Sequence, residues 1–398
     1  MAKKRKRSSV ASFVRHLHSS SNPHDANTSS NSTQNLNLSA YHPDLDPSTL
    51  HPTSLAEYNS LLPQCLVHPT QFSPSMRKYW HHRFSLFSLY SSGILLDEQS
   101  WYSVTPESVA FRIAKRCASD KVVVDLFAGA GGNAIQFAMT CGGSVIAVEL
   151  DEVKVRLGRW NAEVYGVGDR ITYIQGDSIE LLDTIRVWRE RRENARNGAA
   201  EEDDEVWNGI KASDLSNVEA VFLSPPWGGV DYAAQPSSTN PDTATKPPSN
   251  SLYSLGSIQP IDGTTLFLRV YNAFRTPNIA YYLPRNTDLN QLSHLATLLT
   301  STPTTPSKPP VHNAPLTKPS PAESPDTLST PSSPTASAKP HLNATLHPNQ
   351  HTTLHAPHTK LKLEYQYVNH GTKLSSLTAY YGSLATEWDD EIDDWSKS

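Results

Sequence analysis

Short apolar runs alternate with stretches of helical spacing through the middle of the chain. The apolar runs are typical of buried strands and cover residues 121–127, 144–149, 171–174, 218–223 and 278–283. Between and after them, helical spacing covers 134–140, 152–165, 266–274 and 289–299. Two stretches of strict alternation, 361–367 and 374–381, then predict an antiparallel hairpin. We therefore expect an α/β fold with a seven-stranded, mostly parallel sheet that the C-terminal hairpin closes.

Composition divides the chain into ordered and low-complexity parts. Residues 1–74 are rich in Ser, Asn, His and Pro, and residues 300–358 are rich in Ser, Thr and Pro. Such segments bury too little apolar surface to offset the entropy lost on ordering. The expected organisation is a disordered basic and polar tail, a helical lid, an α/β core with three disordered inserts, and an acidic tail. In residue numbers these are 1–74, 75–115, 116–383 with inserts at 186–213, 236–250 and 300–358, and 384–398.

Charge and cysteine content restrict the classes of partner. The net charge of -5 argues against a generally basic nucleic-acid surface. The three cysteines have neither metal-ligand spacing nor an even disulfide framework, so we expect a reducing compartment and no metal site. No run is apolar enough for a membrane span or a signal peptide. The basic run Lys3–Arg7 indicates nuclear targeting or a nucleic-acid arm, and a solvated charge run is the alternative.

A glycine-rich turn follows the first predicted strand. Asp125 stands just before it, and the turn itself is Ala128-Gly129-Ala130-Gly131-Gly132-Asn133. The second strand ends at Glu149, whose carboxylate could accept hydrogen bonds from both hydroxyls of a ribose. The glycine spacing differs from the dinucleotide fingerprint, and no Walker lysine follows. With Asp125 in place, S-adenosylmethionine fits this pattern better than a dinucleotide.

Two further positions have both a structural and a ligand-binding interpretation. Asp177 follows the third strand, where its carboxylate could accept the amine of an adenine or could cap the next helix. Thr105 precedes Pro106, which predicts a helix with Thr105 as the N-cap and the proline at the first helical position. From the residues alone, a capped helix and a ligand contact are equally good interpretations of Thr105.

The turn after the fourth strand carries the most specific chemistry. Its sequence is Ser224-Pro225-Pro226-Trp227-Gly228-Gly229, and the two prolines force the chain out of the sheet. The Ser224 hydroxyl and the Pro225 carbonyl could accept the hydrogens of an exocyclic amine, while Trp227 offers a stacking face. A flat base with such an amine suits this arrangement. The alternative is an ordinary proline-rich turn with a core tryptophan.

Together these motifs resemble the trimethylguanosine synthases, which are RNA cap guanine-N2 methyltransferases. The likeness covers about 77–299 and 361–382 without the inserts. It rests on Lys78-Tyr79-Trp80, Trp101–Glu107, Asp125–Asn133, Asn161–Gly166, Ser224–Tyr232 and Leu283–Asn286. The departures are Glu149 in place of an aspartate, Trp160 in place of a smaller polar residue, and the long inserts.

The resemblance implies a class I, Rossmann-like methyltransferase core with an N-terminal helical lid and S-adenosylmethionine as cofactor. The implied substrate is the 7-methylguanosine cap of small nuclear and nucleolar RNAs, free or in ribonucleoproteins. Two successive transfers to N2 would give the 2,2,7-trimethyl cap. The expected setting is the nucleus or nucleolus, with an import receptor recognising Lys3–Arg7, a monomeric enzyme, and neither DNA nor membrane as partner.

The resemblance also implies roles for individual residues. The catalytic positions are Ser224, Pro225 and Trp227. The cofactor positions are Thr105, Asp125, Gly129, Gly131, Asn133, Glu149 and Asp177. Trp227 would stack on the methylated base with Asn161 in the same pocket, and the cap phosphates would meet Lys78, Tyr232 and Arg285.

Two other functions stay open at this point. Ser-Pro-Pro-aromatic turns also serve amino-methyltransferases of DNA or ribosomal RNA, although such enzymes need a broad basic groove or a base-flipping domain. A cap-binding scaffold without transfer activity is the second alternative. The intact Asp125, Glu149 and glycine turn argue against that scaffold.

Overall fold

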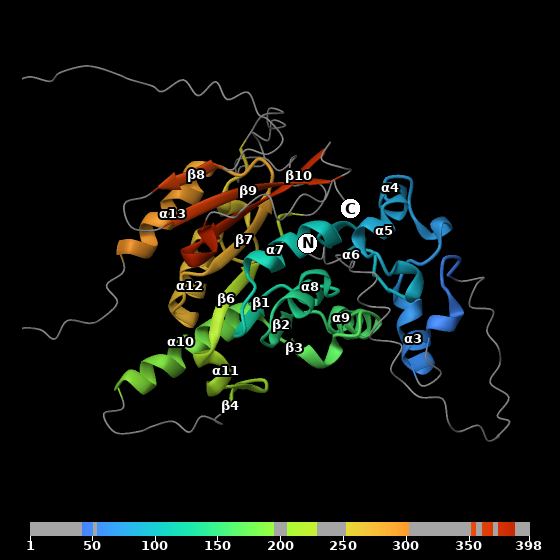
Figure 1. The fold of residues 1–398 in the computed structure, drawn as a ribbon, viewed down its shortest axis with the longest axis horizontal. Coiled ribbons are helices and arrows are strands. Elements are labelled where there is room, and N and C mark those ends of the chain that lie inside the picture. Colours follow the sequence, from blue (N-terminus) through green and yellow to red (C-terminus); the bar gives the residue numbers. More distant parts are fainter. Residues whose placement is uncertain are drawn as a thin grey trace, which may run out of the picture. The chain divides into compact units, whose positions relative to one another are not determined.

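The computed structural model describes residues 42–50, 54–194, 205–228, 252–301, 352–355, 360–368 and 373–386. Except for Ser301, all of these belong to one compact unit (Figure 1). Its α-helices are α3 (Leu55–Leu61), α4 (Arg77–His81), α5 (Arg83–Leu86), α6 (Ser100–Ser103), α7 (Glu107–Arg116), α8 (Gly132–Thr140), α9 (Glu152–Val164), α10 (Ser178–Asn194), α11 (Ala212–Ser216), α12 (Gly263–Phe274) and α13 (Leu289–Ser301). Short 3-10 helices are η1 (Pro47–Thr49), η3 (Leu62–Gln64), η4 (Pro69–Gln71), η5 (Tyr90–Ser92), η6 (Gly168–Arg170), η9 (Leu255–Ser257) and η10 (Gly382–Ala385).

A single large sheet organises this unit. In the part of the chain that the structure describes, it has eight strands in the order β3-β2-β1-β6-β7-β10-β9-β8. Its members are β1 (Val122–Asp125), β2 (Val145–Glu149), β3 (Ile171–Gln175), β6 (Val218–Leu223), β7 (Ile279–Pro284), β8 (Thr352–His355), β9 (Lys360–Val368) and β10 (Lys373–Tyr381). The first five in spatial order pair in parallel, and β10, β9 and β8 pair antiparallel. The predicted mostly parallel sheet with a C-terminal hairpin is confirmed, and β8 adds one strand at the edge.

Helices cover both faces of the sheet, as continuous apolar strands require. Figure 1 shows α7, α8 and α9 on one side and α10, α12 and α13 on the other. Buried residues form two clusters accordingly, one of which joins the lid to α7–α9, while the other joins α10, α12 and α13. Strand β1 contributes residues to both clusters, since Val123 belongs to the first and Val122 and Val124 belong to the second.

The N-terminal boundary of the folded unit differs from the prediction. Within the expected tail 1–74, Tyr58, Leu61, Cys65 and Phe72 are buried. Phe72 meets Trp101 edge-on at 4.9 Å between ring centroids. These apolar residues lie on short helices and turns, so they show no sustained period, and composition alone mistakes them for a disordered segment.

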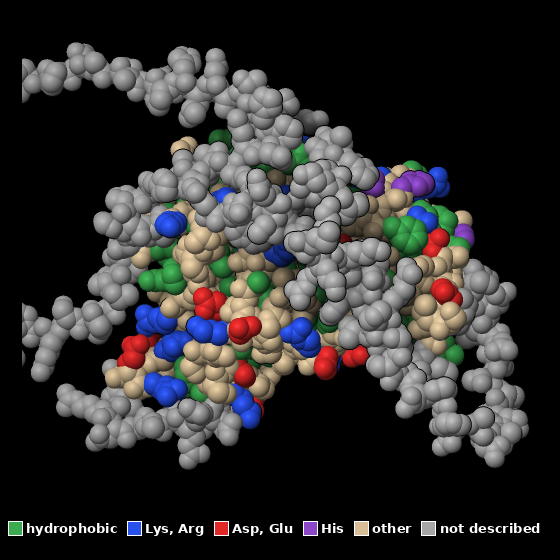
Figure 2. All heavy atoms as spheres, in the orientation of Figure 1, with side chains coloured by type: hydrophobic (Ala, Val, Ile, Leu, Met, Phe, Trp, Pro, Cys, Tyr) green, Lys and Arg blue, Asp and Glu red, His purple; other side chains and the backbone are tan. Residues whose placement is uncertain are grey.

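The expected insert 186–213 also contains ordered structure. Helix α10 continues to Asn194, and a small hairpin follows, formed by β4 (Glu205–Trp207) and β5 (Ile210–Lys211). Trp207 and Ile210 are buried in the second cluster. Charged side chains of both signs gather over α10 (Figure 2), which explains why the segment resembles a solvated loop. The disorder expected near 186–213 is therefore wrong for residues 186–194 and 205–213, and the helix extension that the charged sequence also suggested is observed.

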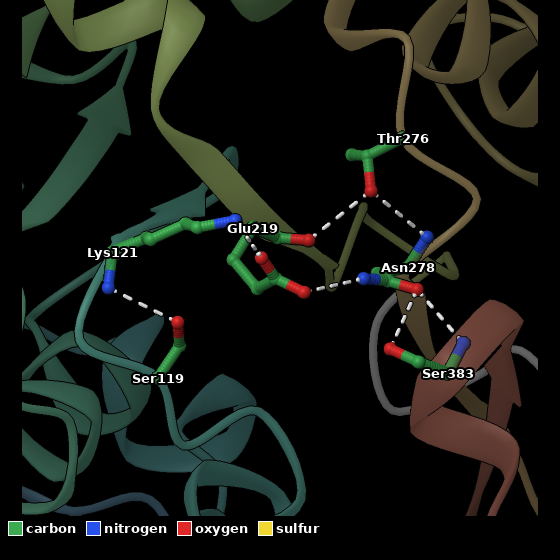
Figure 3. Close-up of polar contacts among 6 residues, drawn as sticks. All are labelled: Ser119, Lys121, Glu219, Thr276, Asn278 and Ser383. Atoms are coloured by element: carbon green, nitrogen blue, oxygen red, sulfur yellow. Dashed lines mark hydrogen bonds and ion pairs between the residues drawn. The ribbon is translucent and has the colours of Figure 1, made fainter.

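The amino ends of the parallel strands are joined by a polar network (Figure 3). Glu219 on β6 receives hydrogen bonds from Lys121 Nζ and Asn278 Nδ2, each at 2.9 Å. The other amide atom of Asn278, Oδ1, accepts from the backbone and the hydroxyl of Ser383 at 2.8 and 2.9 Å. This network stabilises the edge of the sheet that lies opposite the strand carboxyl ends.

Several predicted segments lie outside the described residues. These are Lys3–Arg7, residues 195–204 of the first insert, the insert 236–250, residues 302–351 and 356–358 of the last insert, and residues 387–398 of the acidic tail. The start of that tail is described, and Leu384 and Ala385 are buried there in η10. No helix among the described residues is both long and apolar enough to cross a bilayer.

Candidate active site

The predicted site residues lie where parallel strands end. Asp125 ends β1, Glu149 ends β2, Asp177 follows β3, Ser224 follows β6 and Arg285 follows β7. All five strands run parallel, so their carboxyl ends share one edge of the sheet. Ligands of open α/β sheets bind at this edge.

The glycine turn between β1 and α8 needs its glycines. Gly129 and Gly131 have φ angles of 53° and 94°, which favour glycine. A Cβ on Gly131 would lie 2.6 Å from the hydroxyl oxygen of Tyr173. Glu149 Oε2 accepts a hydrogen bond from the Gly129 amide at 2.8 Å, so the second strand fixes the turn.

Asp125 is the most perturbed acid of the site. Its side chain is fully buried, Oδ1 accepts from the Phe127 amide at 3.2 Å, and Oδ2 has no hydrogen-bond partner. Burial, reinforced by the Glu149 charge and opposed by the Phe127 hydrogen bond, raises the pKa of Asp125 to about 7. A buried carboxylate oxygen without a partner is costly, and a cationic ligand at the turn would supply one. The buried carboxylate of Asp125 therefore fits S-adenosylmethionine, which carries an ammonium and a sulfonium.

Glu149 and Asp177 are half-buried and keep acceptor capacity. Glu149 Oε1 accepts from the Asp151 amide at 3.0 Å, and each of its oxygens has room for a second donor. Asp177 Oδ1 accepts from the Ile179 amide at 2.8 Å at the start of α10. Asp177 thus makes the helix-capping contact that the sequence suggested, while its binding of adenine stays a prediction.

Thr105 connects the lid to the glycine turn. Its Oγ1 accepts from Asn133 Nδ2 at 3.0 Å, and Asn133 Oδ1 is buried without a partner. Helix α7 begins at Glu107, and no side chain caps it, so the predicted N-cap role of Thr105 was wrong. The hydroxyl is used instead across the interface between lid and core, next to the turn.

Asn161 on α9 connects the lid to the glycine turn through its side-chain amide. Its Oδ1 accepts from the Leu95 amide, and its Nδ2 donates to the carbonyls of Leu95 and Ala130, each at 3.0 Å. The side chain is fully buried. Both amide hydrogens are used on backbone oxygens, so Asn161 has none left to donate to a substrate. We therefore revise its expected role from lining the base pocket to fixing the lid on the glycine turn.

Replacing Asn161 with alanine tests this revised role. The change leaves the buried backbone groups of Leu95 without partners, and we expect a loss of about 3 kcal/mol in unfolding free energy. We also expect the KM for the methyl donor to rise, because the turn loses its contact at Ala130. Chemical denaturation and initial rates measure both effects.

Asn278→Ala is the matched control. Like Asn161, Asn278 makes three hydrogen bonds through a buried side-chain amide, but it lies at the opposite edge of the sheet. We expect a similar loss of stability with an unchanged KM. Equal KM values in both variants would mean that Asn161 acts only through stability.

The Ser224–Trp227 turn holds an indole beside a polar group. Ser224 Oγ donates to the Phe127 carbonyl at 3.3 Å, so its lone pairs remain available as acceptors. Trp227 Nε1 donates to the Tyr282 carbonyl at 3.2 Å, and the two rings are 5.0 Å apart and tilted by 42°. Tyr253 donates its hydroxyl to the Trp227 carbonyl at 3.2 Å. These contacts orient a half-buried indole at the strand edge.

The residues expected to meet cap phosphates are less tightly fixed. Lys78 is exposed on α4, with Nζ 4.9 Å from the centroid of the Tyr79 ring. Arg285 is exposed after β7 and donates to the Leu374 carbonyl at 3.2 Å. Tyr232 lies outside the described residues. Their phosphate contacts therefore stay predictions.

Sequence reasoning missed three tyrosines of the site. Tyr253 and Tyr282 fix Trp227, and Tyr173 places a buried hydroxyl without a partner beside the glycine turn. Tyr173 had a signal, since alternation along β3 puts it on the same face as Ile171. No pattern in the sequence links Tyr253 to Trp227, because η9 and its preceding loop have no period.

Comparison with known proteins settles the family. The model of the RNA cap guanine-N2 methyltransferase family matches residues 120–383. This chain belongs to that family. The predicted resemblance is confirmed, and the protein is an S-adenosylmethionine-dependent RNA cap guanine-N2 methyltransferase.

Two similar proteins are trimethylguanosine synthases, in agreement with this family. A trimethylguanosine synthase of Schizosaccharomyces pombe is 34% identical over 59% of this chain and 81% of its own length. One of Saccharomyces cerevisiae is 32% identical over 54% of this chain and 56% of its own length. Among solved structures, an O-methyltransferase from Bacillus cereus in complex with SAH aligns at 9% identity over 78% of this chain and 91% of its own. Its TM-score of 0.32 is too low to carry an argument.

Proposed function

We propose that this methyltransferase acts on the 7-methylguanosine cap of small nuclear and nucleolar RNAs and transfers two methyl groups in succession to N2. The product is the 2,2,7-trimethyl cap. The observation that carries the proposal is the position of Trp227 and Ser224. An oriented indole and a hydroxyl oxygen with free lone pairs lie at the strand edge that also holds Asp125 and Glu149.

The base fits this turn for a chemical reason. Ser224 Oγ and the Pro225 carbonyl accept the two hydrogens of the exocyclic amine, which orients N2 and raises its electron density. Trp227 stacks on the purine. Methylation at N7 makes the purine cationic, and a cation over an indole gains about 0.5–2 kcal/mol relative to a neutral ring. The turn therefore prefers 7-methylguanine to guanine.

The cofactor residues complete the arrangement. Asp125, Asn133 and the glycine turn would hold the amino-acid part of S-adenosylmethionine, Glu149 its ribose and Asp177 its adenine. When bound, the cofactor supplies a methyl group that is already strongly electrophilic. The chain needs no nucleophile and no strong general base, since N2 becomes acidic only as the new bond forms. Alignment of the amine is the main contribution of the protein.

The remaining parts of the proposal concern the substrate beyond the base. Lys78, Tyr232 and Arg285 contact the triphosphate of the cap. The enzyme acts as a monomer in the nucleus or nucleolus on RNA or ribonucleoprotein, and an import receptor binds Lys3–Arg7. The departures from the usual family pattern, Glu149 and Trp160, leave this scheme intact. Trp160 is buried and its indole N–H donates to the Gly93 carbonyl at 2.7 Å.

Labelled methyl transfer tests the proposal. We expect incorporation into 7-methyl-GTP, roughly 2- to 30-fold less into GTP at equal concentration, and none into DNA. Mass spectrometry of the product should show first one and then two added methyl groups. Transfer to GTP at the same rate would contradict the base preference, and transfer only to DNA would contradict the function. A product that stops at one added group would contradict the second transfer.

A further inference from the structure

The lid carries a basic and aromatic surface that the cap site does not use. We define the α4–α5 surface as Arg77, His81, His82 and Phe84. All four are exposed, and Phe84 keeps 46% of its surface in solvent. Figure 2 shows histidine, basic and apolar side chains together at this place. An exposed phenylalanine alone is ordinary, so its surroundings decide its meaning.

The chain segment that forms this surface carries basic side chains and no acidic ones. No Asp or Glu occurs from residue 58 to residue 96, although the whole chain has a net charge of -5. Within the described residues, Arg77, His81 and His82 form no ion pair, whereas the acid Asp44 is bound to Arg83 at 2.7 Å. Two further acids lie next to this segment: Asp46, whose amide donates to the Ser91 carbonyl, and Glu107, whose carboxylate accepts from the amide and hydroxyl of Ser88. Arg77 therefore remains available to an anionic partner, and the exposed rings of His81 and His82 can donate hydrogen bonds to it.

Packing holds Phe84 in place as a platform. The guanidinium of Arg83 lies 4.7 Å from the Phe84 ring centroid and 4.6 Å from the Trp80 ring centroid. Tyr90 meets Phe84 edge-on at 5.9 Å between centroids. Since Arg83 is fixed by Asp44 and by the Trp80 carbonyl at 2.9 Å, the supported side of Phe84 is rigid while the rest faces solvent.

The α4–α5 surface continues from Lys78, the residue proposed to meet the cap triphosphate. Lys78 and His81 are three residues apart on helix α4 and so share one side of it, and His82 is the C-cap residue that follows. The triphosphate joins the cap to the first transcribed nucleotide, so the RNA must leave the site past Lys78. Cations that meet phosphates and an aromatic ring that stacks on a base are the means by which proteins bind single-stranded RNA without reading its sequence.

We infer that the α4–α5 surface binds the nucleotides that follow the cap, with Phe84 stacking on a base and Arg77, His81 and His82 meeting phosphates. This inference rests on the proposed function, because it takes capped RNA as the substrate. It goes further in making the lid a determinant of which capped molecules are good substrates. The enzyme should favour a capped chain over an isolated cap, independently of sequence.

Steady-state kinetics with two substrates test the inference in the full chain. One substrate is 7-methyl-GTP, which has no nucleotide after the cap, and the other is a short m7G-capped, unstructured oligoribonucleotide. We expect Phe84→Ala to raise the KM for the oligoribonucleotide about tenfold, with the KM for 7-methyl-GTP unchanged. Phe84→Tyr should restore the wild-type value, since it keeps the ring. Arg77→Ser should raise the same KM and weaken its dependence on salt.

Arg191→Ala, an exposed cation on α10, is the matched control and should change neither KM. Equal KM values for the oligoribonucleotide in wild type and Phe84→Ala would overturn the inference and leave this surface to a protein ligand. An equal rise for both substrates would also overturn it. If the wild-type enzyme methylates neither substrate, the proposed function itself fails, which is a different result.

Discussion

Replacing Trp227 with alanine should abolish most of the enzyme's preference for a 7-methylated cap. The indole is held by its N–H bond to the Tyr282 carbonyl and by the tilted Tyr282 ring, so its position is set before a base arrives. Removing it takes away the stacking of any purine and the additional attraction of a cationic one. We expect the ratio of kcat/KM for 7-methyl-GTP over GTP to fall roughly 2- to 30-fold. We expect kcat/KM itself to fall about 100-fold.

A conservative change separates these two losses. Trp227→Phe keeps a stacking ring with a weaker attraction for cations, so it should recover activity more than selectivity. Thermal melting should accompany the kinetics, because Trp227 also packs against both clusters of buried residues. A ratio that stays at the wild-type value in Trp227→Ala would show that selectivity arises elsewhere.

Replacing Asp125 with asparagine should stabilise the protein without its cofactor and at the same time weaken cofactor binding. Burial raises the pKa of Asp125 to about 7, against an ordinary value of 3.8. The folded state therefore keeps a proton that the unfolded state releases between about pH 4 and 7. The contribution of this group to stability is complete below pH 4 and is lost as the pH rises through 7.

The expected stability of Asp125→Asn follows from this loss of wild-type stability as the pH rises. A shift of about three units corresponds to at most about 4 kcal/mol, and the uncompensated amide of the asparagine offsets about 1–3 kcal/mol of it. At pH 8 the variant should be about 1–3 kcal/mol more stable than the wild type, and near pH 4, where the wild-type carboxyl is protonated, it should be about 1–3 kcal/mol less stable. Denaturation at the two pH values measures the difference.

The affinity of Asp125→Asn for the cofactor should fall, whereas its stability at pH 8 rises. The asparagine lacks the charge that pairs with a cationic group at the glycine turn, and we expect a loss of about 10- to 100-fold in affinity. Calorimetric titration with S-adenosylhomocysteine, which keeps the ammonium, measures it. Unchanged affinity would mean that Oδ2 of Asp125 does not face the cofactor. Lower stability of the variant at pH 8 would contradict the raised pKa.

The sheet and most of the site could be predicted because they depend on local patterns. β-Branched runs, alternation and a glycine turn fix β1, β2 and the hairpin of β9 and β10 within one or two residues. The carboxyl ends of parallel strands then bring Asp125, Glu149 and Ser224 to one edge without any knowledge of tertiary contacts. The glycine turn with Asp125 already favoured S-adenosylmethionine, and the family resemblance added the identity of the base.

The parts that the sequence did not predict depend on contacts between distant segments. Tyr58 and Phe72 are buried by Trp160 and Trp101, which lie far along the chain, so their own surroundings resemble a disordered tail. Trp207 fills the space above Gly176, where a Cβ would lie 2.2 Å from its ring, and nothing near residue 207 indicates this. Asn161 was assigned to the base pocket by likeness, yet its three hydrogen bonds all go to backbone atoms.

The central claim is that Trp227 and two oxygen acceptors hold a 7-methylguanine with N2 directed at the methyl donor. The most direct measurement is a crystal structure of the enzyme with S-adenosylhomocysteine and 7-methyl-GTP. The account predicts the purine stacked on the indole of Trp227, with N2 within hydrogen-bond distance of Ser224 Oγ and the Pro225 carbonyl. A purine bound at another surface, or one with N2 turned away from Ser224, would contradict it.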